Sequence, residues 1–399
     1  MTAPRMCYVS GSGAHMAGTW PINVLPTGQI TAGAVLWRQA GQLNATVVVE
    51  SQLRLVPDRA MMELPSEAVL PEQLAPRLEQ AEVYISRAEA HAQQSSAAIA
   101  VRLVIYRGEA LIDKNLLVYP YDVSSGRARA VESVPLEPPQ PALGVVVDPA
   151  RPDQAASFGP MSGQQRADLL GGLPTPSMQG NVMELPDDLP FTFFRAAQPD
   201  QVVKALHGDE WVVLDGMHPT LPRLQSQLPR KVAVARVYSP GLAESAMFEL
   251  PLRADRLVID AVAARCALFW RGDFTVADEA RADEYVAVAA MVRPGQAPRW
   301  PTIEEIRQRT EQMEAMSAWF DAAADAAAPS VSGMDSMPPS VARAMQRAQT
   351  QGPQIPDQSA DQLEMALSDQ MPRGNASMED YVSSLFYRLE GPDEPPKKE

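Results

Sequence analysis

Proline occurs 37 times in this chain of 399 residues, against 23 glycines. Because proline lacks a backbone N–H and clashes with the preceding helical turn, this frequency disfavours a bundle of long helices. Strands, loops and linkers are favoured instead. The stretch PLEPPQP at residues 135–141 predicts a stiff connector. It would separate an N-terminal β-rich half, residues 1–134, from a C-terminal β-rich half, residues 142–296.

Apolar and polar residues alternate within these halves, and a period of two indicates strands. In residues 45–55, ATVVVESQLRL, Val47 and Val49 fall on one side, and Val48 and Glu50 fall on the other. The same pattern predicts further strands over residues 83–85, 99–105, 111–118, 211–214, 232–238, 246–252, 257–270 and 285–292.

Two local signals refine this pattern. Arg107-Gly108-Glu109 predicts the turn of a hairpin between residues 99–105 and 111–118. Residues 199–206 predict a short helix, with proline in its first turn and Gly208 placed to end it. We therefore expect a mainly β fold, α+β overall. Its antiparallel β-sandwich-like body would have one or two packed subdomains.

Residues 301–399 differ in character and predict an acidic, Met/Ala/Gln/Pro-rich tail that is helical or partly disordered. It carries 17 acidic and 8 basic residues. Thr302 and Glu305 form a capping box, which predicts that an amphipathic helix begins there.

Charge and cysteine content exclude several functions. The formal charge of −15 repels phosphate backbones, so nucleic acid is not an expected partner. Cys7 and Cys266 are the only cysteines and lack metal-site spacing, so we expect no disulfide framework, metal or other cofactor. No signal peptide or membrane-spanning run is evident, which predicts a cytoplasmic protein without membrane contact.

Enzymatic signatures are weak. The sequence has no P-loop, no GxSxG elbow and no HExxH pair. The best constellation is the HGDE stretch at residues 207–210 together with Asp215 and His218, which would supply an acid, a base and a metal ligand to an uncharacterised hydrolase. The favoured alternative is a simple turn into the next strand with solvated acidic residues. We therefore assign no catalytic residue and expect no enzyme.

Two places are candidates for partner binding. Trp270 and Arg271 would form an aromatic and cationic patch, unless the tryptophan packs into the core at a strand end. In the tail helix, an adaptable apolar surface would either bind a partner groove or dock on its own domain. Its residues are Met313, Met316, Trp319 and Phe320.

Four segments together resemble a type VI secretion-associated family catalogued as domain of unknown function 2169. They are ATVVVESQLRLVP at 45–57, AEVYISRAEAHA at 81–92, residues 195–229 with their Gly-Asp-Glu and His-Pro elements, and LVIDAVAARCALFWRG at 257–272. Order and spacing agree over residues 30 to 295, so both β-rich halves would belong to one family domain. The chain departs from the family at Glu50, where a lysine is usual, and in a shortened stretch over 141–172.

The resemblance implies an effector adaptor or chaperone in the cytoplasm of a Gram-negative bacterium. Its expected partners are a PAAR-like protein, a toxin effector, or both, with VgrG as a further candidate. It would promote loading of this cargo onto the VgrG spike. The alternatives are a structural component of the secretion particle and the hydrolase described above.

Overall fold

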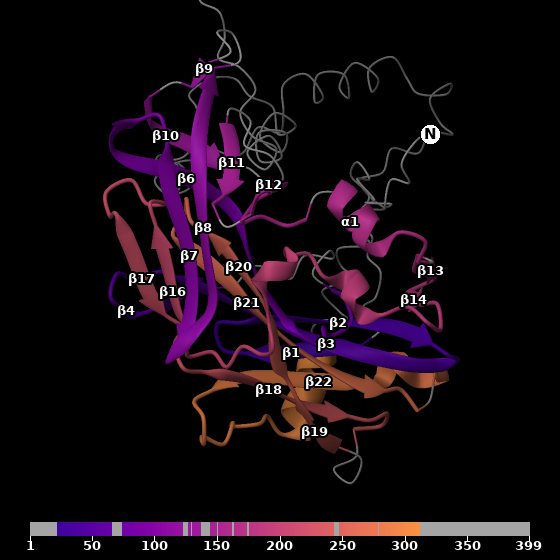
Figure 1. The fold of residues 1–399 in the computed structure, drawn as a ribbon. Helices are drawn as coiled ribbons and strands as arrows, with labels where there is room; N and C mark the ends of the chain where they lie inside the picture. The colour runs from indigo at the N-terminus through magenta and orange to yellow at the C-terminus, as the bar shows by residue number, and fades with distance from the viewer. Residues whose placement is uncertain are drawn as a thin grey trace, which may run out of the picture. The chain divides into compact units, whose positions relative to one another are not determined.

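The computed structural model describes residues 22–311, except 66–73, 123–126, 129, 137–143, 150, 162, 174, 243–246 and 278. This part of the chain is mainly β, as the alternation predicted, and its strands form three sheets (Figure 1). Most strand pairs are antiparallel, but β1–β22, β14–β2, β17–β4 and β20–β6 are parallel. No helix within these residues is long and apolar enough to cross a membrane.

The largest sheet has ten strands, and its central strands come from both sides of the proline-rich connector. In spatial order it contains β10 (Val131–Leu136), β6 (Ala81–Ser96), β20 (Arg253–Asp260), β21 (Arg265–Thr275), β3 (Gln42–Arg54), β2 (Thr31–Gln39), β14 (Val182–Glu184) and β13 (Ser177–Gln179). Two short strands, β15 (Val202–Val203) and β5 (Met62–Glu63), pair with β6 and β3. The strands β20 and β21 thus lie between β6 and β3.

An eight-stranded sheet contains the predicted hairpin, formed by β7 (Ile99–Arg107) and β8 (Glu109–Asp122). Gly108 occupies the turn with a φ of +77°, a conformation that glycine adopts at little cost. The other strands are β12 (Arg151–Ala155), β11 (Gly144–Asp148), β16 (Trp211–Asp215), β17 (Arg223–Gln227) and β4 (Arg59–Ala60), with β9 (Arg127–Ala128) paired to β8.

The third sheet consists of β1 (Asn23–Thr27), β22 (Val286–Val292), β18 (Val232–Tyr238) and β19 (Met247–Pro251). Residues 303–311 are helical, and the predicted capping box is present at their start. The Thr302 N–H donates to Glu305 (2.7 Å), and the Glu305 N–H donates to the Thr302 hydroxyl (3.2 Å). Ile306 is fully buried in a cluster with residues of the third sheet: Leu25, Tyr238, Val286 and Val288.

The helix predicted for residues 199–206 is wrong. Only Pro199–Gln201 form a 3-10 turn, η3, and the chain then continues as β15 along β6. Val202 and Val203 are β-branched and gain ladder bonds there, which outweighs the weak local helix signal. The other helical elements are α1 (Gly163–Leu170), η2 (Phe191–Phe194) and η5 (Glu279–Glu284).

The single extended run predicted for residues 257–270 is instead a hairpin of β20 and β21. Asp260 accepts a hydrogen bond from the Ala263 N–H at 2.9 Å, and Ala264 adopts a φ of +50° in the turn. Small residues permit this turn although neither glycine nor proline marks it.

The core follows the alternation of the central strands. Val47 and Val49 of β3 lie in a large cluster shared with both other sheets, whereas Val48 faces a second, smaller cluster. Leu268 and Phe269 of β21 divide in the same way. Both faces of the ten-stranded sheet are therefore covered, and residues 185–193 belong to the cover of the second face.

Candidate functional site

The HGDE stretch forms a tight turn that leads into β16. Gly208 has a φ of +82°, and the fully buried carboxylate of Glu210 accepts the N–H groups of His207 (2.6 Å), Gly208 (2.9 Å) and Asp209 (3.2 Å). A carboxylate with three backbone donors is committed to fixing the turn. The turn itself agrees with the favoured alternative, but Glu210 is not solvated as expected.

The other two members of the constellation, Asp215 and His218, lie at or beyond the far end of β16. His207 precedes the five-residue strand β16 and His218 follows it, so the strand alone separates them by roughly 16 Å. The Nδ1 atom of His218 accepts the Leu221 N–H at 3.1 Å, while Asp209 pairs with Arg107 at 2.5 Å. The structure brings His207 Nδ1 to 3.3 Å from Glu210 Oε1, but His218 lies at the other end of β16 and does not join them.

Trp270 and Arg271 are in the interior, with 3% and 0% of their surfaces exposed. The Trp270 ring packs against the HGDE turn: a Cβ added at Gly208 would lie 3.2 Å from the ring. Two segments that sequence reasoning treated separately therefore meet in the core. Trp270 packs into the core, which was the alternative to a binding role. The predicted partner-binding patch of Trp270 and Arg271 is therefore wrong, because neither side chain reaches the surface.

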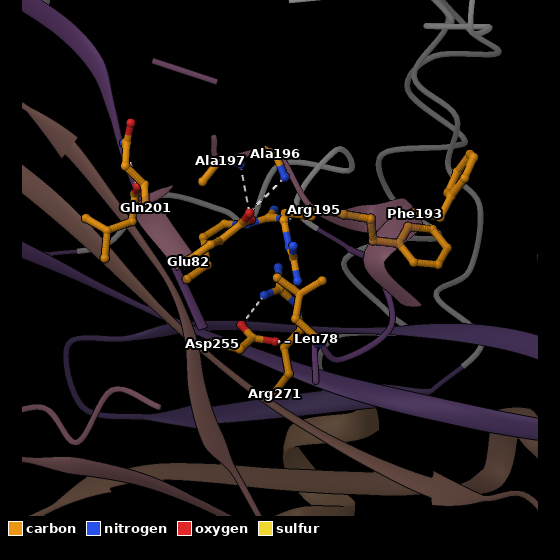
Figure 2. Close-up of polar contacts among 12 residues, drawn as sticks. Leu78, Glu82, Phe193, Arg195, Ala196, Ala197, Gln201, Asp255 and Arg271 are labelled. Atoms are coloured by element: carbon orange, nitrogen blue, oxygen red, sulfur yellow. Dashed lines mark hydrogen bonds and ion pairs between the residues drawn. The ribbon is translucent and has the colours of Figure 1, made fainter. Parts of the chain in front are cut away.

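Arg271 belongs instead to a buried ionic cluster that is built around a β-bulge (Figure 2). The register of β20 against β21 shifts between Ala254 and Arg256, so Asp255 is the extra residue. Asp255 binds the guanidinium of Arg271 and also accepts the Leu78 N–H at 3.0 Å. The cluster thereby fixes the backbone that leads into β6.

The neighbouring ion pair joins Arg256 of β20 to Glu82 of β6, with 2.6 Å between Nε and Oε1. The second oxygen of Glu82 accepts the N–H groups of Ala196 and Ala197, both at 2.8 Å, as Figure 2 shows. Arg256 also donates to the Phe194 carbonyl at 2.9 Å. Both members of the pair thus bind the backbone that crosses above them.

A second polar group lies at the η3 turn. The Lys114 ammonium donates to the Ser157 carbonyl (2.7 Å), Asp200 (2.9 Å) and Gln201 (2.9 Å). The buried Gln201 amide donates to the carbonyls of Val83 and Phe158. These bonds satisfy backbone carbonyls that would otherwise be buried without partners.

Burial dominates the electrostatics of the ionic cluster. It raises the pKa of Asp255, and the positive charge of Arg271 and the Leu78 N–H counteract that rise. Burial is also the largest single influence on Arg256 and acts to lower its pKa, but the attraction and hydrogen bond of Glu82 together with the attraction of Tyr84 and Asp255 outweigh burial, so the pKa of Arg256 is raised. Two carboxylates thus balance two guanidinium groups, and all four side chains hold backbone or one another. The described residues contain no group of acidic, histidine or cysteine side chains suited to a metal.

The edge strand β19 carries two neighbouring exposed apolar side chains. Among the described residues, β19 pairs only with β18, so its other edge has no strand partner there. Met247 and Phe248 are 38% and 39% exposed, and Phe248 packs edge-on against Phe274 at 5.6 Å between ring centroids. An edge with exposed apolar side chains is suited to pairing with an extended segment of another protein.

The tail residues predicted to bind a partner, Met313, Met316, Trp319 and Phe320, lie outside the described residues. The described helical residues 303–311 pack on the third sheet through Ile306. Sequence reasoning missed Glu82, Lys114, Asp255 and Arg256. The only available signal was the presence of charged residues within or next to predicted strands, and that signal does not distinguish a buried ion pair from a solvated face.

Residues 125–271 match the model of a family described as an uncharacterized protein conserved in bacteria, DUF2169. The match includes the HGDE turn, the bulge at Asp255 and Arg271, and it supports the resemblance found in the sequence. No curated protein and no solved structure matches the chain.

Proposed function

We propose that this protein is a non-enzymatic adaptor or chaperone that binds a type VI secretion effector, or its PAAR-like carrier, and promotes loading onto the VgrG spike. The resemblance of four segments supports the link to secretion, and the family match over residues 125–271 supports the family. An adaptor of this kind acts in the cytoplasm of the producing cell.

The observation that carries the binding role is the edge of β19. Partner strands add to such edges through backbone hydrogen bonds, while exposed side chains supply selectivity. Met247 and Phe248 provide apolar contacts on the two sides of the strand, because successive side chains alternate. Glu249 lies between Phe248 and the buried Leu250 and pairs with Arg236, which leaves the apolar residues as the principal contacts.

The hydrolase alternative has less support. Glu210 of its constellation is buried and accepts three N–H groups, and its two histidines lie at opposite ends of β16. General acid–base catalysis requires these groups within hydrogen-bond reach of one substrate.

A pull-down of the full-length protein from its native cell, read by mass spectrometry, tests the proposal. Stoichiometric capture of a toxin or a PAAR-like protein is expected, with the adaptor itself retained in the cell. Appearance of the protein in the secreted fraction with VgrG would favour a structural component of the particle. Absence of any stoichiometric partner would contradict the adaptor role.

Variants of the edge then test the binding surface. We expect Phe248→Lys and Met247→Lys each to weaken binding of the captured partner about tenfold or more, as loss of an interface anchor does. Val262→Lys is the matched control, because Val262 is 56% exposed in the β20–β21 turn, away from β19. Unchanged affinity in both edge variants, with unchanged melting temperatures, would exclude this edge.

A further inference from the structure

Residues 175–203, here called the strap, cross one face of the ten-stranded sheet from β2 to β6. At one end β14 pairs with β2 through three residues, and at the other end β15 pairs with β6 through two. The sheet order places β3, β21 and β20 between these ends. The strap therefore spans five strands with only short ladders at its two ends.

The middle of the strap is held by side chains of the sheet that bind its backbone. Glu82 accepts the Ala196 and Ala197 N–H groups, and Arg256 donates to the Phe194 carbonyl. At the β2 end, the Gln39 amide donates to the Pro186 and Leu189 carbonyls, both at 3.1 Å. Strands with a continuous ladder of backbone hydrogen bonds unfold only together with the whole domain. The middle of the strap lacks such a ladder.

The strap covers an apolar strip of the sheet, formed by Val35, Trp37, Val48 and Phe269. Leu185, Leu189 and Phe193 of the strap belong to this cluster, together with Leu74 from outside the strap. Phe191 meets the Trp37 ring edge-on at 5.4 Å. Closure is favourable because it removes this apolar surface from water. It also provides the backbone donors that the buried Glu82 carboxylate needs.

We propose that the strap is a hinged cover that opens as one unit while the strands it crosses, from β2 to β6, and the other two sheets stay folded, and that the buried Glu82–Arg256 pair is its latch. In the closed position, the buried charges of Glu82 and Arg256 are stabilised by one another and by the backbone of the strap. Removing one charge leaves the other buried without full compensation in the closed state, which favours opening. Opening exposes the apolar strip.

Native-state hydrogen exchange of the full-length protein, followed by mass spectrometry, tests this directly. In the wild type, peptides covering residues 185–203 should exchange at low denaturant through an opening that leaves β18 and β22 protected. Exchange of the strap only at the free energy of global unfolding would overturn the proposal. This measurement needs no cargo, so its outcome is independent of the proposed adaptor function.

The variant Glu82→Gln should speed exchange of the strap about tenfold or more, since each factor of ten corresponds to about 1.4 kcal/mol, and should leave β18 and β22 unchanged. Asp113→Asn is the matched control, because it removes the exposed Arg102–Asp113 pair on the β7–β8 hairpin. Equal acceleration in all peptides, or none in the strap, would show that the pair is not a latch. If Glu82→Gln does not fold, the wild-type profile still decides whether the strap opens by itself.

Discussion

The thiol of Cys266 illustrates how burial alone sets the chemistry of a residue. It lies in β21 against the Met61 sulfur, 3.4 Å away, and burial raises its pKa to about 12. Because the thiolate is the reactive form, we expect iodoacetamide at pH 8 not to modify Cys266 in the native protein. Peptide mass spectrometry distinguishes it from Cys7, and denatured protein serves as the positive control. Rapid native modification would contradict this burial.

At position 208 the backbone conformation and its close neighbours leave no room for any residue other than glycine. Its φ is +82°, and a Cβ there would lie 2.5 Å from the Lys231 carbonyl oxygen. We expect Gly208→Ala to destabilise the protein by about 2–4 kcal/mol, the sum of left-handed strain and steric overlap. Urea unfolding would measure the change.

Gly180→Ala is the control for this experiment, because Gly180 also has a positive φ but open space around its Cα. It should cost only about 1 kcal/mol, from backbone strain alone. Equal losses of stability in the two variants would show that the contact with Lys231 and the Trp270 ring has no effect.

At the scale of elements, the capping box shows a helix start set by local sequence. Hydrogen bonds from Thr302, first from its backbone N–H, lower the pKa of Glu305. Because the pKa of Glu305 is lower in the folded than in the unfolded protein, its ionised form stabilises the helix start. This stabilisation is complete above the unfolded pKa and is lost as the pH falls through the folded pKa. We therefore expect NMR to show fraying of residues 303–305 as the solution is acidified below the ordinary glutamate pKa of 4.5.

The variant Glu305→Gln is the control, because it cannot titrate and should remove that pH dependence while keeping a capping side chain. An unchanged titration of the helix start in this variant would assign the effect to another group. Glu305 is fully exposed, so the effect should be confined to the helix start and leave the sheets unchanged.

At the scale of the whole molecule, the order of strands links distant parts of the chain. The strands β20 and β21 lie between β6 and β3, and the main core draws residues from all three sheets. A fragment of residues 1–136 would keep β3 and β6 but lack the strands between them, so their edges and apolar faces would be exposed. We expect this fragment not to fold, as judged by circular dichroism and NMR dispersion. A folded, monomeric fragment would show that the N-terminal half is independent.

The class of fold and much of the local structure follow from the amino-acid sequence alone. Alternation located most of the longer strands but missed β2 and most of the short ones. Gly108 located the hairpin turn, and Thr302 with Glu305 located the helix start. These features depend on neighbours within a few residues, where side-chain period, φ preference and capping chemistry act directly. The division of Val47 and Val48 between two faces belongs to the same group.

Contacts between residues far apart in the chain depend on the three-dimensional fold and could not be predicted. Local sequence favoured a helix after Pro199, but pairing with β6 converted Val202 and Val203 into a strand. The local sequence predicts an exposed cation at Arg271. In the structure, the β-bulge at Asp255 provides Arg271 with a buried ion-pair partner. The free energy of burying a charged side chain depends on which groups replace the water around it. Those groups come from distant parts of the chain, so burial and ion pairing are set only when the sheets assemble.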